Sequence, residues 1–254
     1  MKISEIIKKS VAEAPEYKWP TYDGAELDRS KYVTASEVGK CLRQIWFGKY
    51  AAKYGIPAGK EKAGWGFWQR GHNVEAWVVE QLRRSNDADF EYIGEDQVSF
   101  YNEVQSGTPD GLMIAENGIV LFDIKSMDPR KSRKNLPEEK HIKQVMQNID
   151  LVEECLEITI TGGKLVYVNC SDYEDILEFD LARNEDMMDE LHGRACQVMA
   201  AEAAEQLPPE GIYDAGCQYC TFTEHCNAAQ ERSKKLKAQA QQQEKVAKNV
   251  FGKS

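Results

Sequence analysis

Residues 109–125 read PDGLMIAENGIVLFDIK, a stretch in which two apolar runs flank an Asn-Gly pair. Asn-Gly between β-forming runs is a strong signal for a tight hairpin turn. If this pair forms a two-residue turn, Asp110 lies opposite Lys125. The same count sets Leu112 opposite Asp123. Opposed residues share a face of the sheet, as do residues two apart on a strand. The pattern therefore predicts that Asp110, Asp123 and Lys125 lie together on one side of a hairpin.

Two carboxylates and a lysine on one face suit the cleavage of a phosphodiester. Asp110 and Asp123 would hold Mg²⁺ or Mn²⁺, which prefer oxygen ligands. The cation lowers the pKa of a bound water, while Lys125 orients that water or stabilises the developing charge. Ile124 is expected to turn its side chain into the core, so its backbone carbonyl could join the metal ligands. The alternative is a hairpin with an exposed Asp–Lys cross-strand pair.

The order of motifs along the chain resembles the PD-(D/E)XK nucleases, specifically their RecB-like branch. Upstream of the hairpin, residues 71–75 (GHNVE) resemble the branch's first motif, in which a helix supplies a histidine ligand and an acidic residue. Downstream, residues 141–148 (HIKQVMQN) resemble its Q-x-x-x-Y helix, although Asn148 stands where tyrosine is usual. The resemblance implies catalytic roles for Lys125, Asp110, Asp123, Glu75 and Gln144, and a metal held by His72, Asp110, Asp123 and the carbonyl of Ile124.

This resemblance also implies a fold and an activity. The expected fold is α/β, a restriction-endonuclease-like core whose mixed sheet is flanked by helices. The expected activity is metal-dependent DNA cleavage, by an exonuclease acting on single-stranded or end-containing DNA, with recombination or CRISPR-type proteins as possible partners. Two alternatives stay open: a structure-specific endonuclease, and a non-cleaving DNA-binding or adaptor protein.

Seven cysteines occur in the chain, and three of them form the pattern Cys217-x2-Cys220-x5-Cys226. Three close thiolates leave a metal site one ligand short, and Cys41 is the best fourth candidate. The set resembles the four-cysteine iron–sulfur nucleases of the same branch, which include CRISPR-associated exonucleases and related phage proteins. That resemblance implies a 4Fe–4S cluster that joins the N- and C-terminal segments. The alternative is a zinc knuckle with His225 or Cys41 as fourth ligand. The other three thiols are expected in the core: Cys155, Cys170 and Cys196.

A basic loop follows the hairpin directly and is a candidate for phosphate contacts. Its cations are Arg130, Lys131, Arg133 and Lys134. Trp65, Trp68 and Tyr219 could stack on the bases of a single strand. The alternatives are a merely solvated charged loop and tryptophans that pack within the protein.

The 254 residues suffice for one core with a small appendage. We expect an irregular segment over 1–33, a nuclease domain over 34–227 and a polar tail over 228–254. Helices are expected after a capping box at 34–37, over 65–82, around 142–152 and over 184–206. Strands are expected over 97–101, in the hairpin, and as a pair around Gly162-Gly163. The net charge of −10 argues against nonspecific coating of nucleic acid. The absence of a long apolar run argues against a membrane span, so we expect a cytosolic protein.

Overall fold

The structure is a computed structural model that describes residues 20–57, 64–85, 91–93, 97–115, 117–209, 217 and 220–226, with the single positions 3, 5, 8, 11 and 13. The chain divides into two compact units. One is formed by Met1–Gly39 with Ala63–Met199, and the other by Lys40–Lys62 with Ala200–Ser254. Within the described residues, no helix combines the length and apolar character that a bilayer crossing requires.

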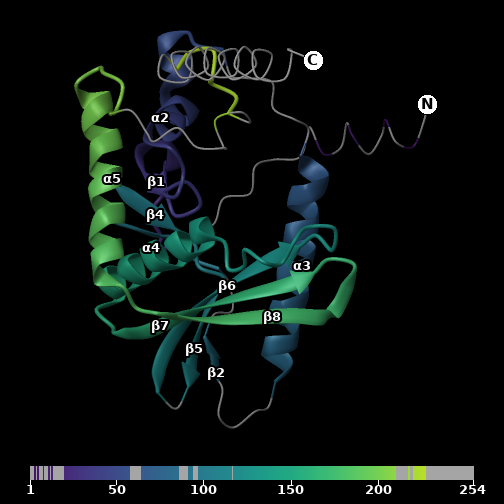
Figure 1. The fold of residues 1–254 in the computed structure, drawn as a ribbon. Coiled ribbons are helices and arrows are strands. Elements are labelled where there is room, and N and C mark those ends of the chain that lie inside the picture. Colours follow the sequence, from purple (N-terminus) through teal and green to yellow (C-terminus); the bar gives the residue numbers. More distant parts are fainter. Residues whose placement is uncertain are drawn as a thin grey trace, which may run out of the picture. The chain divides into compact units, whose positions relative to one another are not determined.

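A five-stranded mixed sheet forms the framework of the first unit (Figure 1). Strands β5 and β6 form the expected hairpin, and β6 pairs in parallel with β7, so a helix must cross between those two. The outer strand β2 pairs antiparallel with β5, and the outer strand β8 pairs antiparallel with β7. In the order of the sheet the strands are β2 (Glu91–Ile93), β5 (Gly111–Ala115), β6 (Gly118–Met127), β7 (Ile160–Asn169) and β8 (Asp172–Ala182).

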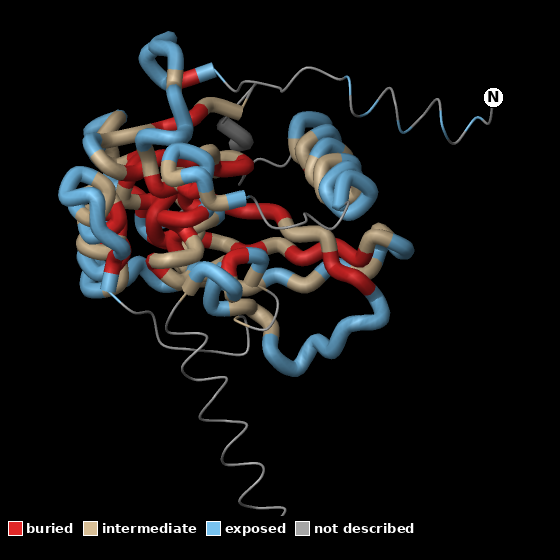
Figure 2. The backbone as a smooth tube through the Cα atoms, turned by 90° about the horizontal axis from the view of Figure 1, so that it is seen from above, coloured by how far each residue is buried: buried red, intermediate tan, exposed pale blue. Residues whose placement is uncertain are grey.

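Helices α3 (Trp65–Arg84) and α4 (Glu139–Leu156) cover opposite faces of this sheet. Val74 and Val78 of α3 pack on Phe122 and Ile124 of β6. On the other face Val145 of α4 lies directly over the backbone of β7. Both helices bury an apolar stripe, as their periodicity predicts. The buried segments gather between these layers, while the connecting loops are exposed (Figure 2).

A second, three-stranded sheet joins β1 (Val33–Thr34), β4 (Gln105–Gly107) and β3 (Phe100–Tyr101). It follows the 3-10 turn η1 (Arg29–Lys31). Strand β4 leads through Thr108 and Pro109 into β5, so this small sheet fixes the entry to the hairpin. The unit ends at Met199, within α5 (Glu185–Ala203), a helix close to the one expected over 184–206.

The predicted hairpin register is wrong by two residues. Ala115 pairs with Gly118 and Gly111 pairs with Phe122, so the turn lies one residue earlier than the Asn-Gly pair. Gly118 takes a φ of +118°, which favours glycine there. A shift of two leaves the faces unchanged, because side chains alternate with a period of two. Leu112 consequently faces Leu121, and Asp110 is brought level with Asp123.

The pair of strands expected around Gly162-Gly163 is also wrong, because β7 runs straight through both glycines. A Cβ on Gly163 would lie 2.4 Å from Val145 Cγ1, and one on Gly162 would lie 2.8 Å from the Leu181 carbonyl oxygen. These glycines therefore permit close packing rather than a turn. The second strand is β8, which the sequence analysis did not identify.

The second unit contains α2 (Leu42–Tyr50) and η2 (Ala51–Tyr54). Helix α2 begins later than expected, because residues 35–39 form turns after the capping contact of Thr34 with Glu37. Phe47 stacks on Phe222 with ring centroids 5.3 Å apart, which joins α2 to the C-terminal cysteine segment. Arg43 Nε donates to the Pro208 carbonyl at 3.0 Å, and Lys53 forms an ion pair with Glu202.

Candidate active site at the fork between two strands

Strands β5 and β6 separate at Asp110. Their ladder ends at the pair Gly111–Phe122, so the next part of β6 has no partner strand on that side. The backbone N–H of Ile124 instead donates to Asp110 Oδ2 at 2.6 Å. The Ile124 side chain is buried against α3, as expected. The fork therefore holds a buried carboxylate against the exposed edge of the D-x-K strand.

Asp123 and Lys125 lie on the same face of β6, toward α4. Lys125 Nζ is 2.5 Å from Asp123 Oδ2, and Gln144 Nε2 of α4 donates to Asp123 Oδ1 at 2.9 Å. Asp123 is fully buried and the Lys125 side chain is 19% exposed. Asp123 Oδ2 accepts no hydrogen bond of ordinary geometry, so its contact with Lys125 is an ion pair.

Helix α3 adds two more groups. His72 Nδ1 lies 3.7 Å from Glu75 Oε2, one helical turn away. Gln97, just before β3, donates to Asp110 Oδ1 at 2.8 Å and also hydrogen bonds Glu75. One amide thus connects the helix carboxylate to the fork carboxylate.

The three carboxylates repel one another in a buried setting. Burial raises the pKa of Asp110 well above its usual range, and the charges of Asp123 and Glu75 raise it further. Burial likewise raises the pKa of Asp123 and of Glu75. The positive charge of Lys125 opposes these shifts. Burial lowers the pKa of Lys125 itself, but the charges of Asp123 and Asp110 outweigh burial, so that pKa is raised. The cluster therefore gains from additional positive charge.

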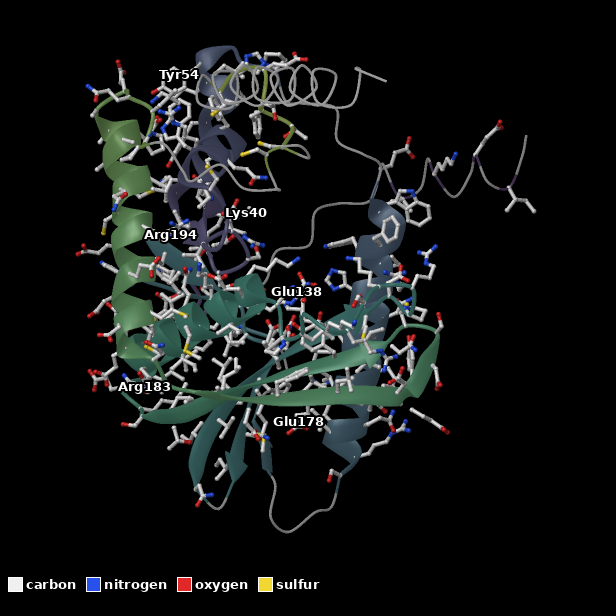
Figure 3. The ribbon with its side chains drawn as sticks, viewed as in Figure 1. Lys40, Tyr54, Glu138, Glu178, Arg183 and Arg194 are labelled. Atoms are coloured by element: carbon white, nitrogen blue, oxygen red, sulfur yellow. The ribbon has the colours of Figure 1, made fainter. Side chains whose placement is uncertain are left out.

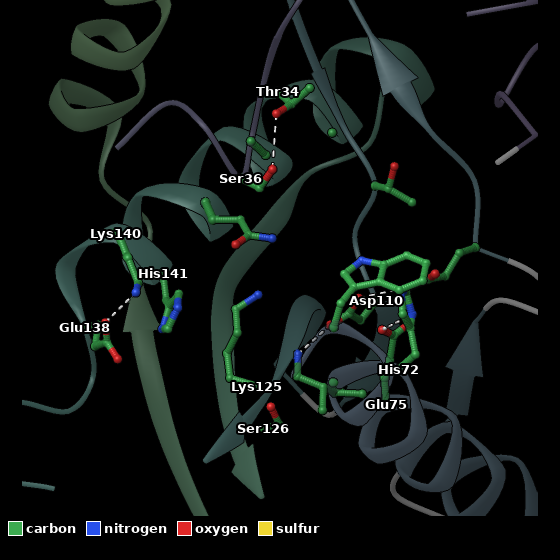
Figure 4. A pocket seen from close by; sticks show the side chains of 18 of the residues that line it. Thr34, Ser36, His72, Glu75, Asp110, Lys125, Ser126, Glu138, Lys140 and His141 are labelled. Carbon is green, nitrogen blue, oxygen red and sulfur yellow. Dashed lines mark hydrogen bonds and ion pairs between the residues drawn. The ribbon is translucent and has the colours of Figure 1, made fainter. Parts of the chain in front are cut away.

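Glu75, Asp110 and Lys125 line a cavity of about 510 Å³, and so does Gln144, which hydrogen bonds the buried Asp123. Figure 4 shows His72, Glu75 and Asp110 on one side of it and Lys140 and His141 on the other, with Lys125 between them. Glu138, which also lines the cavity, lies just before α4 (Figure 3). The cavity thus joins an acidic wall to a wall rich in cationic and neutral donors.

His141 is held by Tyr167, which faces Lys125 across the β6–β7 pair. Tyr167 Oη lies 2.8 Å from His141 Nδ1 and accepts from the Glu138 N–H at 3.1 Å. Burial, then the charges of Lys125 and Lys140, lower the pKa of His141 to about 3. The imidazole is therefore neutral near pH 7.

The donor set fits a hard divalent cation in its chemistry. Two buried carboxylates, a third carboxylate and a backbone carbonyl are oxygen ligands. Burial raises the pKa of all three carboxyls, and a bound cation would favour their charged forms. Asp123 Oδ2 is a buried oxygen, and among the described residues Lys125 is the cation that pairs with it. Among the described residues, no three His, Cys, Asp or Glu side chains already close around one point.

A family model described as PD-(D/E)XK nuclease superfamily matches residues 16–227. The chain belongs to the PD-(D/E)XK nuclease superfamily. Its PD and D-x-K motifs are the residues that meet at the fork of β5 and β6. No curated protein matches the sequence.

Solved structures share this superfamily fold at low identity. The crystal structure of SSO0001 has a TM-score of 0.52 and 16% identity, covering 90% of this chain and 98% of that one. The alkaline exonuclease LHK-Exo from Laribacter hongkongensis, in complex with dAMP, has a TM-score of 0.50 and 18% identity. That comparison covers 70% of this chain and 90% of that chain. At such identities the likeness concerns the fold alone.

The remaining residues singled out in the sequence fall in different places. Of the basic loop only Lys131 lines the cavity. Arg130 pairs with Asp128 and Arg133 with Asp175, while Lys134 lies outside the cavity lining. Asn148, at the usual tyrosine position of the superfamily helix, is buried and occupies the space over Gly107. Tyr219 and the tail 228–254 lie outside the described residues.

All seven cysteines are free thiols and half-buried. The expectation of core thiols is met most closely by Cys170, which packs against the core cluster of α3 and β6. Cys155 Sγ lies 3.3 Å from the Tyr101 carbonyl oxygen. Cys41, Cys217, Cys220 and Cys226 belong to the second compact unit.

The sequence analysis of this nuclease did not identify Gln97, His141 or Tyr167 as site residues. His141 opens the helix motif and could have been noticed as a polar residue three before Gln144. Gln97 and Tyr167 carry no motif of their own. Gln97 reaches the cavity from the segment before β3, and Tyr167 supports His141 from β7, which pairs with β6. Local periodicity reveals neither position.

Proposed function

We propose that this chain is a metal-dependent deoxyribonuclease that degrades DNA from an end, with single-stranded ends preferred. The observation that carries the proposal is the fork itself. Asp110 and Lys125 line one cavity, and the buried Asp123 forms an ion pair with Lys125. The Ile124 N–H fixes the Asp110 carboxylate beside the strand that bears Asp123 and Lys125. Superfamily membership supports nuclease chemistry, and an exonuclease among the structural relatives makes end-directed cleavage the first mode to test.

The residues that would hold Mg²⁺ or Mn²⁺ are Asp110, Asp123, His72 and the carbonyl of Ile124. When bound, such a cation supplies Lewis acidity to the phosphate and lowers the pKa of a ligated water. Gln144 keeps Asp123 oriented through its 2.9 Å hydrogen bond. Lys125 holds a positive charge on the same face and donates to the phosphate oxygen that gains charge. Glu75, whose pKa is raised by burial, can accept a proton from the attacking water.

End-directed cleavage is tested with linear and circular single-stranded DNA of one sequence. The linear substrate carries a label at either end, and each reaction runs with Mn²⁺ or with chelator. Progressive shortening of the linear DNA with the circle intact supports the proposal. Cleavage of both would replace it with an endonuclease. Binding without cleavage in any cation would replace it with a DNA-binding or adaptor protein.

We also propose that Cys41, Cys217, Cys220 and Cys226 hold a 4Fe–4S cluster with a structural role. Their membership in one compact unit supports this, as does the packing of Phe47 on Phe222 between the first and last cysteines. Arg43 Nη1 lies 3.9 Å from Cys226 Sγ, a further contact between α2 and the C-terminal cysteine segment. The same four thiols would also suit zinc.

A further inference from the structure

Two large aromatic side chains lie in water at the edge of the cavity. Phe67 is 63% exposed and Trp68 is 65% exposed, on the first turn of α3. Both line the same cavity as Asp110 and Lys125. We call this pair the aromatic platform. Contacts within the described protein leave most of both rings exposed, whereas Trp77 of the same helix is half-buried and packs on Tyr173 at 4.8 Å.

The aromatic platform is held in place by its neighbours on α3. Trp68 and His72 make a T-shaped contact with ring centroids 4.1 Å apart. The Arg70 guanidinium lies 5.2 Å from the centre of the Phe67 ring. One of the rings therefore contacts the imidazole that we assign to the metal. A group on the platform would lie directly beside the proposed reaction centre.

The chemistry of the surrounding wall indicates the occupant. Lys131 lines the same cavity and offers positive charge to a phosphate, while the platform offers flat apolar surface. Lys140 also lines the cavity and is ion paired with Glu138 at 2.7 Å. A nucleotide of a single strand combines these two features, because its base has a free π-face and its phosphate is anionic. In a duplex both base faces are covered by neighbours, so a base must first be unpaired and unstacked.

We propose that Phe67 and Trp68 stack an unpaired nucleobase adjacent to the scissile phosphate, and that this contact selects single-stranded or frayed ends. The inference rests on the proposed nuclease function and deepens it by naming the two side chains that would select a single-stranded end. Stacking depends on the base face rather than on base edges, so the platform tolerates any sequence.

The test measures equilibrium binding by fluorescence anisotropy, with Ca²⁺ as the cation and substrate integrity checked afterwards. The probes are an oligothymidylate and an oligonucleotide of equal length whose terminal three positions are abasic. Trp68→Ala should weaken binding of the oligothymidylate roughly 5- to 150-fold, the range measured for one base–aromatic stack. Wild type and Trp68→Ala should bind the abasic probe equally. Trp68→Tyr should restore most of the loss, and Phe67→Ala should weaken oligothymidylate binding in the same direction.

Ile114→Ala is the matched control, because Ile114 is an exposed apolar residue outside the cavity lining. It should bind both probes as wild type does. Equal weakening of both probes by Trp68→Ala would overturn the inference, since the loss would then not come from a base. If the wild type cleaves DNA and Trp68→Ala binds the oligothymidylate as tightly as the wild type does, the inference is overturned as well. If the wild type neither binds nor cleaves DNA, the proposed nuclease function fails and the inference falls with it.

Discussion

The Ile124 N–H donates to Asp110 Oδ2 at 2.6 Å, in the position where a strand partner would otherwise stand. This single bond joins the two motifs of the site, because Asp110 ends one strand and Ile124 lies between Asp123 and Lys125 on the other. It also draws a carboxylate into a buried position next to a second one. The fold bears an electrostatic cost there when no cation is bound.

That cost leads to the first prediction. Replacing Asp110 by asparagine should raise the unfolding free energy in chelator at pH 7.5 by about 1–2 kcal/mol, the ordinary scale of a single substitution. Asparagine keeps an oxygen for the Ile124 N–H and removes the charge. Because burial raises the pKa of Asp110 in the folded state, the cost of ionisation is present above that pKa and disappears as pH falls toward the unfolded value.

The measurement is thermal unfolding of both proteins across pH in chelator. The difference in unfolding free energy between Asp110→Asn and the wild type should shrink as the pH is lowered. Mn²⁺ should stabilise the wild type and leave Asp110→Asn nearly unchanged. A variant less stable than wild type at pH 7.5 in chelator would contradict this account of the fork.

A second prediction concerns His72. Its removal deletes one ligand of several, so His72→Ala should weaken Mn²⁺ binding about tenfold without abolishing it. Isothermal titration calorimetry measures this directly. His192→Gln is the control, because His192 hydrogen bonds Gln105 and does not line the cavity. Equal Mn²⁺ affinity in His72→Ala and wild type would mean that α3 does not reach the metal.

Gln97 provides the third prediction. Its amide donates to Asp110 Oδ1 and hydrogen bonds Glu75, so it positions two carboxylates at once. Gln97→Met keeps the length and removes the donor. We expect Mn²⁺ affinity to fall about 10- to 100-fold, the range for groups that orient metal ligands. Gln69→Met should have no effect, because the Gln69 amide reaches Asn73 on the exposed side of α3. If Gln97→Met and Gln69→Met bind Mn²⁺ with equal affinity, Gln97 does not position the metal ligands.

The hairpin, α3 and α4 were predictable because apolar residues recur in each of them at the spacing typical of a strand or a helix. The hairpin register was wrong by two residues, yet the faces were right, since only an odd shift exchanges them. Gly162 and Gly163 were misjudged for a physical reason. Local sequence suggested a turn, whereas Val145 of α4 leaves no room for a Cβ on Gly163, and the Leu181 carbonyl of β8 leaves none on Gly162.

The site was predictable only as far as its motifs extend. Asp110, Asp123 and Lys125 stand in motifs of fixed spacing, and the structure brings them together. Gln97 reaches the site through its hydrogen bond to Asp110, and Tyr167 through the pairing of β7 with β6; no local pattern records either contact. The basic loop misled for a related reason, because Arg130 and Arg133 form ion pairs with Asp128 and Asp175 that sequence does not reveal.

The fourth prediction concerns the cysteines. Protein purified without oxygen should be brown, with visible charge-transfer absorbance that zinc, a closed-shell ion, does not give. Cys41→Ser should remove the colour as completely as Cys220→Ser, although the two residues lie far apart in the sequence. Both variants should also unfold at lower temperature, because metal binding adds to folding free energy.

Cys155→Ser serves as the control for that experiment, since Cys155 belongs to the other compact unit, and it should keep the colour. Colour retained in Cys41→Ser would exclude Cys41 as a ligand. A colourless protein with one zinc per chain would replace the cluster with a zinc site and leave the nuclease site unaffected.

The most direct test of the nuclease assignment is a paired measurement on Lys125→Ala. The carboxylates hold the metal, while Lys125 supplies charge to the reacting phosphate, so the two properties should separate. Under single-turnover conditions with Mn²⁺, cleavage of linear single-stranded DNA should fall at least about 10²- to 10³-fold. Mn²⁺ binding measured by calorimetry on the same preparation should stay within a few-fold of wild type. Cleavage at the wild-type rate by Lys125→Ala would contradict the assignment of this cavity as the active site.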